Sequence, residues 1–182
     1  MKHLIISIIS IILSSPMYAQ KIMVDKTENG IRSIMTTTKI CRDFTDKAVF
    51  SFGLAAYITD SDTSYKLIID ITRDEQTTPQ TGEQVSLRTA SNEVMKLDIS
   101  NISSREDATV IGNTLYTSYI TTIYADLTAT QLDKLCTDGI IKIRIPSSLG
   151  NIDKEYKKDK ASPILSKCLT LINDTSSTTD DF

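Results

Sequence analysis

Alternating apolar and polar positions dominate much of the chain and predict a series of β-strands. Residues 49–59 and 65–73 place large apolar side chains at every second position, a period typical of half-buried strands. Gly53, inside the first of these segments, indicates a bulge or a close backbone approach. Residues 31–41 are rich in isoleucine and threonine and predict an earlier strand, whereas 20–30 is polar and is expected to be a frayed lead-in.

Residues 85–99 predict a β-hairpin. A three-residue turn at 91–93 would place Leu87 opposite Leu97, whereas a two-residue turn would place Leu87 opposite Lys96. Because directly opposed residues share a face of the sheet, the apolar pattern favours the three-residue turn.

A short helix is predicted over 129–138, and the sequence specifies both of its ends. Thr128 and Gln131 have the spacing of a capping box, in which each side chain bonds the other residue's backbone N–H. Gly139 supplies the left-handed residue that ends a helix. Three apolar residues with helical spacing form the face that is expected to be buried: Leu132, Leu135 and Cys136.

Strands are predicted on either side of this helix, at 115–125 and 141–145, and a parallel, an antiparallel or a sheet-switching connection stays open. Residues 101–107 are expected to be a loop. A second helix, 163–173, begins with a proline at its first position. The acidic, Ser/Thr-rich segment 173–182 is expected to be a disordered tail.

These elements predict one β-rich domain over residues 20–172. We expect a mainly β or α+β fold, an antiparallel β-sandwich or open barrel of about seven to eight strands. The helices 129–138 and 163–173 would cover an end or an open face of the sheets.

The first 19 residues have the pattern of a secretory signal peptide. Lys2 supplies the positive start, residues 4–13 form an apolar run, and Ala19 is a small residue at the cleavage position. The apolar run is too short for a membrane-spanning helix. We therefore expect a mature chain that starts at Gln20, has no membrane span, and resides in the periplasm or outside the cell.

Composition narrows the candidate chemistry. His3 is the one histidine of the chain and would leave with the signal peptide, so the mature protein would lack an imidazole for a triad, a proton shuttle or a metal site. The net charge of −3 disfavours a nucleic-acid partner. Residues 60–64 resemble the start of a calcium loop but lack its later glycine and glutamate, so we interpret them as a turn. We expect no catalytic residue, cofactor or metal.

The three cysteines, Cys41, Cys136 and Cys168, would allow one disulfide in an oxidising compartment. Cys136 and Cys168 both fall on predicted helical apolar faces, which favours that pair, with Cys41 as the alternative partner. In the other interpretation all three are buried thiols.

Two tyrosines give the remaining candidate site. Tyr116 and Tyr124 share one face of the strand predicted at 115–125, and we hypothesise that they form part of a recognition surface. The simpler interpretation is that both are half-buried strand residues.

The run from Leu127 to Ile145, with its capped helix, its glycine and its alternating basic strand, resembles a segment of small exported proteins of anaerobic Gram-negative bacteria. In those proteins this segment follows a β-rich half with a hairpin like that at 85–99. The resemblance implies export and a β-rich fold. That group has no assigned activity, so no functional residue follows from it.

We therefore expect an exported, non-catalytic binding or structural domain, with an envelope protein or a glycan as its partner. One alternative is a glycan-cleaving enzyme that uses two carboxylates. Another is an inhibitor or protection protein for a target in the cell envelope.

Overall fold

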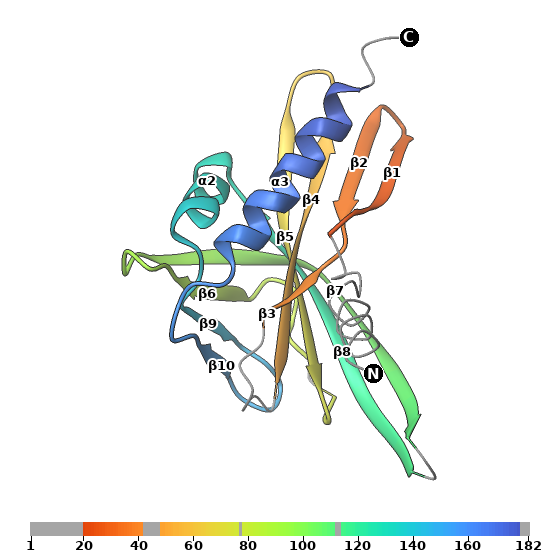
Figure 1. The fold of residues 1–182 in the computed structure, drawn as a ribbon, viewed down its shortest axis with the longest axis vertical. Coiled ribbons are helices and arrows are strands. Elements are labelled where there is room, and N and C mark those ends of the chain that lie inside the picture. The colour runs from red at the N-terminus through yellow and green to blue at the C-terminus, as the bar shows by residue number, and fades with distance from the viewer. Residues whose placement is uncertain (1–19, 42–47, 77, 112–113, 179–182) are drawn as a thin grey trace, which may run out of the picture.

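The computed structural model of the chain describes residues 20–41, 48–76, 78–111 and 114–178, and the predicted signal peptide lies outside them. The described residues form ten strands and two helices (Figure 1). The strands are β1 (Ile22–Glu28), β2 (Ile31–Thr36), β3 (Lys39–Cys41), β4 (Val49–Ile58), β5 (Thr63–Arg73), β6 (Gln84–Arg88), β7 (Val94–Ile111), β8 (Thr114–Leu127), β9 (Lys142–Ile145) and β10 (Ile152–Glu155). The helices are α2 (Ala129–Asp138) and α3 (Ser162–Ser177).

All ten strands belong to one open sheet with the order β1-β2-β4-β5-β8-β7-β6-β9-β10, and β3 pairs with β4 beside β2. Every strand pair is antiparallel. The predicted mainly β, antiparallel fold is thus confirmed, with ten strands in place of seven to eight.

Strand β7 connects the two halves of the sheet. Its first residues pair with β6, the remainder pairs with β8, and the register shifts between Ile99 and Asn101. A bulge of this kind bends a strand and increases its twist. The bend lets both halves of the sheet contribute to one apolar core.

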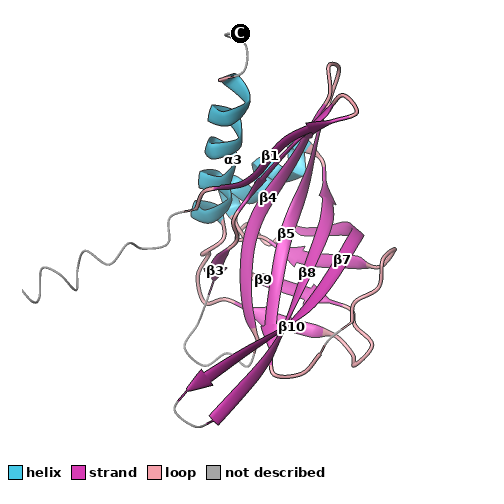
Figure 2. Ribbon diagram, turned by 90° about the vertical axis from the view of Figure 1, so that its right-hand side faces the viewer, coloured by secondary structure: helices cyan, strands magenta, loops and turns pink. Residues whose placement is uncertain are grey.

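The two helices pack on one face of the sheet (Figures 1 and 2). Helix α3 contacts β2 and β4, and α2 contacts α3 and β5. On β5, Leu67, Ile69 and Ile71 point into the core with almost no exposed surface. We call this side of β2, β4, β5 and β8 the core face, and the opposite side the open face.

Helix α2 has the predicted bounds and the predicted N-terminal cap. The Gln131 N–H donates to Thr128 Oγ1 at 3.2 Å, and the Thr128 N–H donates to Gln131 Oε1 at 2.9 Å. Leu132 and Leu135 are its buried residues. Two backbone donors at the helix start are therefore satisfied by side chains, which fixes where the helix begins.

The connection after α2 is held by a carboxylate. Gly139 has φ 65° and ψ −157°, a backbone conformation that is almost confined to glycine. A side chain there would also collide with the carboxylate of Asp159. Asp159 Oδ1 accepts from the N–H groups of Ile140 at 3.1 Å and Ala161 at 2.8 Å. Asp159 thus joins the end of α2 to the start of α3.

Helix α3 is longer than the sequence predicted, and this corrects the expectation of a disordered tail from residue 173. The helix runs to Ser177. The Arg32 guanidinium, paired with Asp25, donates to the carbonyls of Thr175 at 2.9 Å and Ser176 at 3.4 Å. Carbonyls in the last turn of a helix need partners from outside the helical ladder. Arg32 on β2 supplies donors to both carbonyls, and the Thr178 hydroxyl also donates to that of Thr175 at 3.2 Å, so the last turn is stabilised.

Two segments that were expected to be irregular are strands. Residues 22–28 form β1, where a frayed lead-in was expected, and 101–107 belong to β7, where a loop was expected. The second error has a clear cause. This part of β7 has largely exposed side chains on both faces, so no apolar alternation marks it.

The hairpin at 85–99 has the predicted loop length but a different register. Val85 lies opposite Leu97 and Leu87 opposite Met95. The N–H of Thr89 bonds the carbonyl of Glu93, which leaves three loop residues that end at Asn92 with φ 64°. A slip of two residues keeps every side chain on its face, so the apolar pattern alone could not detect it.

The strand after α2 does not return to β8. Strand β9 pairs with β6 on one side and β10 on the other. The connection through α2 therefore joins β8 to a strand three places away in the same sheet, and not to a parallel neighbour. The prediction for 31–41 is also refined, because this segment is divided between β2 and β3.

Candidate functional site

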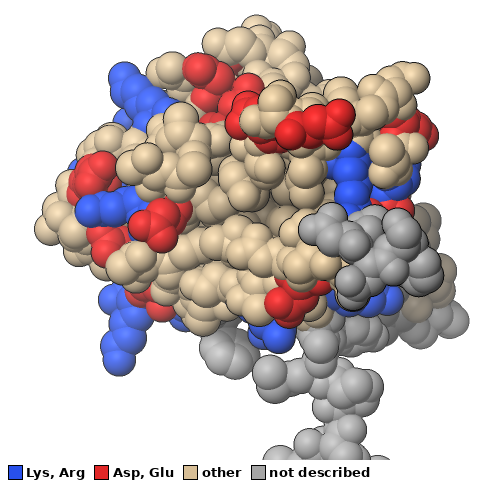
Figure 3. Space-filling view, turned by 90° about the horizontal axis from the view of Figure 1, so that it is seen from above, with Lys and Arg blue, Asp and Glu red and all other residues tan. Residues whose placement is uncertain are grey.

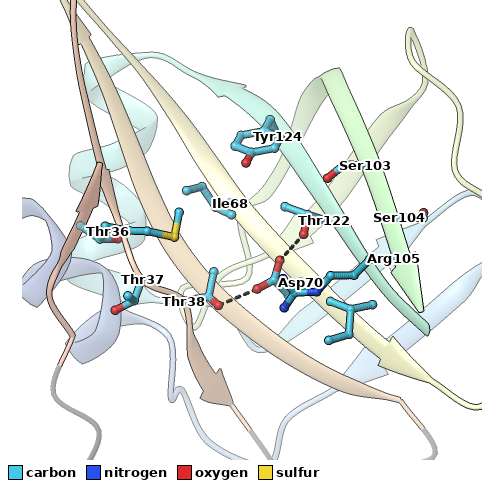
Figure 4. Close-up of a pocket in the computed structure, with 12 residues that line it drawn as sticks. Thr36, Thr37, Thr38, Ile68, Asp70, Ser103, Ser104, Arg105, Thr122 and Tyr124 are labelled. Atoms are coloured by element: carbon cyan, nitrogen blue, oxygen red, sulfur yellow. Dashed lines mark hydrogen bonds between the residues drawn. The ribbon is translucent and has the colours of Figure 1, made fainter. Parts of the chain in front are cut away.

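The open face carries a groove of about 390 Å³ (Figure 4). Its floor and one wall come from alternate residues of three neighbouring strands, and its other wall comes from the connection between β2 and β3. The residues that define its chemistry are Ile68 and Asp70 on β5, Thr122 and Tyr124 on β8, Ser103 and Arg105 on β7, and Thr38.

Strand register places these side chains in rows across the sheet. Asp70 lies opposite Thr122, and Thr122 lies opposite Ser103. The next row on one side contains Ile68 and Tyr124, and the next row on the other contains Ile120 and Arg105. Because residues two apart along a strand share a face, all of these side chains point to the open face.

The second wall depends on Gly53. Strands β2 and β3 pair with the same edge of β4, and residues 36–38 cross between them. A Cβ atom at Gly53 would lie 3.2 Å from both Thr36 Oγ1 and Thr38 Cγ2. The missing side chain thus leaves room for this crossing, and the close backbone approach that the sequence indicated at Gly53 is confirmed.

The crossing brings a threonine to the carboxylate on β5. Thr38 Oγ1 donates to Asp70 Oδ2 at 2.5 Å, and Thr122 Oγ1 donates to Asp70 Oδ1 at 2.7 Å (Figure 4). The carboxylate is half-buried. One oxygen is therefore oriented by a hydroxyl from β8 and the other by a hydroxyl from the connection between β2 and β3, and each keeps capacity for another donor.

Tyr124 closes one end of the groove above Ile68, which is only 2% exposed. Burial raises the pKa of Tyr124 above its ordinary value, and the neighbouring Tyr57 and Asp70 raise it further. The phenol therefore remains protonated at neutral pH and can donate a hydrogen bond to a ligand.

The two tyrosines of the predicted recognition surface occupy different environments. Tyr124 lines the groove, whereas Tyr116 does not line it and is 55% exposed. Eight residues separate them along β8, a distance of about 26 Å in an extended strand. Tyr116 lies in the part of the β7–β8 hairpin that projects beyond the neighbouring strands (Figure 1).

The cysteines are separate thiols in the structure, and the predicted pairing of Cys136 with Cys168 is not formed in it. Cys41 and Cys168 are buried, and Cys136 is half-buried. Cys168 Sγ accepts from Gln20 Nε2 at 2.7 Å and from Thr36 Oγ1 at 3.2 Å. Burial raises the pKa of both Cys136 and Cys168, which keeps these thiols protonated and weakly nucleophilic.

Other chemistries find little support in the described residues. They contain no group of three or more histidine, cysteine or acidic residues that could hold a metal ion. Asp70 is the one carboxylate among the described residues that line the groove. In the same part of the chain, none of the helices combines the length and apolar character needed to cross a bilayer.

Charges of both signs are distributed over the upper surface of the molecule. In Figure 3, acidic and basic side chains are interspersed around the margin of this face, and uncharged residues occupy much of its centre. This face therefore presents no continuous surface of one sign.

Sequence reasoning missed the groove and its carboxylate. The alternation predicted for 65–73 implies that Asp70 lies on the side of β5 opposite to Leu67, Ile69 and Ile71, and the structure confirms this. The available signal was Gly53, since a strand glycine often marks a close approach of another backbone. Which segment approaches it, and that this segment brings Thr38 to Asp70, depends on the pairing of β3 with β4.

Comparisons with known proteins identify no protein similar to this chain. No protein-family model matches the chain, and neither the curated proteins nor the solved structures contain a match. The candidate site therefore rests on the geometry of the groove.

Proposed function

We propose that the protein is an exported, non-catalytic binding domain and that the groove on the open face is its binding site. The observation that carries this proposal is Asp70, a half-buried carboxylate held by two threonine hydroxyls at the bottom of an open groove. Ligand sites are typically concave, with an apolar lining and a few fixed polar groups. Export is supported by the pattern of the first 19 residues.

The arrangement favours binding over glycan hydrolysis. Glycoside hydrolysis generally needs two carboxyl groups on opposite sides of the bond that is cleaved. The described lining of the groove supplies one. Both oxygens of that carboxyl group also accept hydroxyl hydrogen bonds, which fix its orientation and suit a role in recognition.

The proposal can be tested with the mature chain. A thermal-shift screen over glycans, short peptides and free amino acids should raise the unfolding temperature with at least one class of ligand. Ser103→Trp should then fill the groove from an exposed position and abolish that shift. Lys96→Trp, on the same strand but outside the groove, is the matched control and should leave the shift intact. A shift that both variants retain would place binding elsewhere.

A second candidate function, inhibition or protection of an envelope target, is favoured by the projecting part of the β7–β8 hairpin. Val110 and Leu115 lie directly opposite each other there, and both are well exposed, as is Tyr116. Exposed apolar side chains of this kind often contact another macromolecule. Val110→Thr combined with Leu115→Ser should abolish retention of one specific envelope protein, while the groove variants should not affect it.

A further inference from the structure

We infer that the ligand of the groove is a small zwitterion, a free amino acid that presents its ammonium group to Asp70 and its carboxylate to Arg105. The inference rests on the proposed function, because it names the ligand class of the same site. It begins from two opposite charges that face one groove and form no ion pair with each other.

The register places these charges a short distance apart. Asp70 and Arg105 lie on strands separated by β8 and in adjacent rows of the open face. Two strand spacings across the sheet and two residues along it give a separation of about 12 Å between their Cα atoms. Both side chains extend over the same part of the groove (Figure 4). A small ligand can therefore contact both.

The surroundings of Asp70 favour a ligand group that donates hydrogen bonds. Its two bonded neighbours, Thr38 and Thr122, both donate to it. An ionised carboxylate only accepts hydrogen bonds, and about four can be accommodated. The remaining capacity suits an ammonium group, whose N–H donors form short, strong bonds to carboxylates.

Arg105 offers the opposite specificity. It is exposed at the mouth of the groove, and no hydrogen bond or ion pair engages its guanidinium group within the described part of the chain. A guanidinium group presents a planar fork of donors that matches both oxygens of a carboxylate. A ligand carboxylate at this position would supply the partner that the described residues do not.

The rest of the groove fits an aliphatic side chain. Ile68 and Ile120 form apolar floor, and Met23, which is well exposed, lines the rim. The volume of about 390 Å³ is near the small end of the range for ligand pockets. Size and lining therefore favour a single amino acid over an extended polymer.

The test is calorimetric titration of the mature chain with a panel of free amino acids of both hands, with L-leucine as the reference probe. N-acetyl-L-leucine lacks the ammonium charge, and L-leucinamide lacks the carboxylate. Each should bind the protein at least roughly tenfold more weakly than the parent amino acid, because a hydrogen bond between charged groups is lost.

Two variants connect each charge to its partner. Asp70→Asn should weaken binding of the free amino acid roughly tenfold or more and leave the residual affinity for the N-acetyl compound unchanged. Arg105→Gln should also weaken binding of the free amino acid roughly tenfold or more, and should leave the residual affinity for L-leucinamide unchanged. Arg88→Gln, which removes an exposed arginine outside this groove, should not alter affinity. Unfolding temperatures near that of the wild type would show that the variants remain folded.

The outcomes separate this inference from the proposed function. Binding of neutral sugars that Ser103→Trp abolishes, with no affinity for any amino acid, would overturn the zwitterion and keep the groove as the binding site. Amino-acid binding that ignores both Asp70→Asn and Arg105→Gln would also overturn it. Small-ligand binding that persists undiminished in Ser103→Trp would overturn both the zwitterion and the groove as the binding site.

Discussion

The two faces of strand β5 carry different kinds of side chain. On the core face, Leu67, Ile69 and Ile71 are packed beneath the helices with almost no exposed surface. On the open face, Lys66 and Asp70 lie on either side of the buried Ile68, and Asp70 is held by hydroxyl groups. The same eleven-residue strand thus provides stability on one side and a polar site on the other.

This difference shows how an antiparallel sheet can separate folding from function. A period of two places every second side chain in the core and leaves the intervening positions available for other roles. Substitutions on the core face should therefore change the free energy of unfolding, and substitutions in the groove should mainly change binding.

The largest effect is expected at Phe52 on β4, which lies opposite Ile69 on the core face and is completely buried. Phe52→Ala should lower the free energy of unfolding by about 3–5 kcal/mol, because it removes buried apolar surface and leaves a cavity. Denaturant titration measures this value. If the alanine variant does not fold, Phe52→Leu should still show a loss of about 1 kcal/mol. No change in either variant would mean that this face is not the core.

The next effect concerns the helices that cover the core face. Gly139→Val should destabilise the protein by about 2–4 kcal/mol, because valine resists this backbone conformation and would collide with Asp159. Asp159→Asn is a useful comparison, since it retains one acceptor for the backbone N–H groups and should cost less. Equal unfolding midpoints for wild type and Gly139→Val would contradict the placement of this junction.

A smaller effect is expected at the start of α2. Thr128→Ala removes the side chain that accepts from the Gln131 N–H and should cost about 1 kcal/mol. Thr128→Ser retains the hydroxyl and serves as the matched control. The comparison of their denaturant midpoints tests the cap, and identical midpoints for alanine and serine would argue against it.

The smallest expected effect is a pH dependence of the free energy of unfolding. It arises from the pair of Asp25 and Arg32 at the C-terminal end of α3. The hydrogen bonds from Arg32 hold the pKa of Asp25 below its ordinary value of 3.8. A depressed pKa adds stability above the unfolded-state value, and this stability is lost as the pH falls through the folded-state value. The wild type should therefore lose more stability below about pH 3.8 than Asp25→Asn does. Thermal unfolding over this acid range measures the difference, and parallel curves would exclude the contribution.

Local patterns in the sequence were sufficient for part of this fold. The capping box and Gly139 specify α2 because capping uses residues that are near in sequence. The alternation in 49–59 and 65–73 identifies β4 and β5 because large apolar side chains occupy one face of each strand. On β4 the opposite face is also buried, but it carries the small residues Ser51, Gly53 and Ala55, so the alternation remains visible as a difference in side-chain size.

The parts that escaped prediction depend on partners that are distant in sequence. The final turns of α3 are stabilised by Arg32, more than 140 residues earlier in the chain. The outer part of β7 is held by its pairing with β8 and has no buried face of its own to mark it. Asp70 was visible as a polar strand residue, but its two hydroxyl partners come from β8 and from the segment that crosses Gly53.

The most direct test of the separation between the two faces compares neighbouring residues of β5, Ile69→Ala and Asp70→Asn, by denaturant titration under identical conditions. Ile69 is completely buried on the core face, so its replacement should lower the free energy of unfolding by about 2–5 kcal/mol. Asp70→Asn should change it by less than about 1 kcal/mol, because asparagine can still accept from a threonine hydroxyl. Equal losses, or a larger loss for Asp70→Asn, would contradict the division of this strand into a core face and an open face.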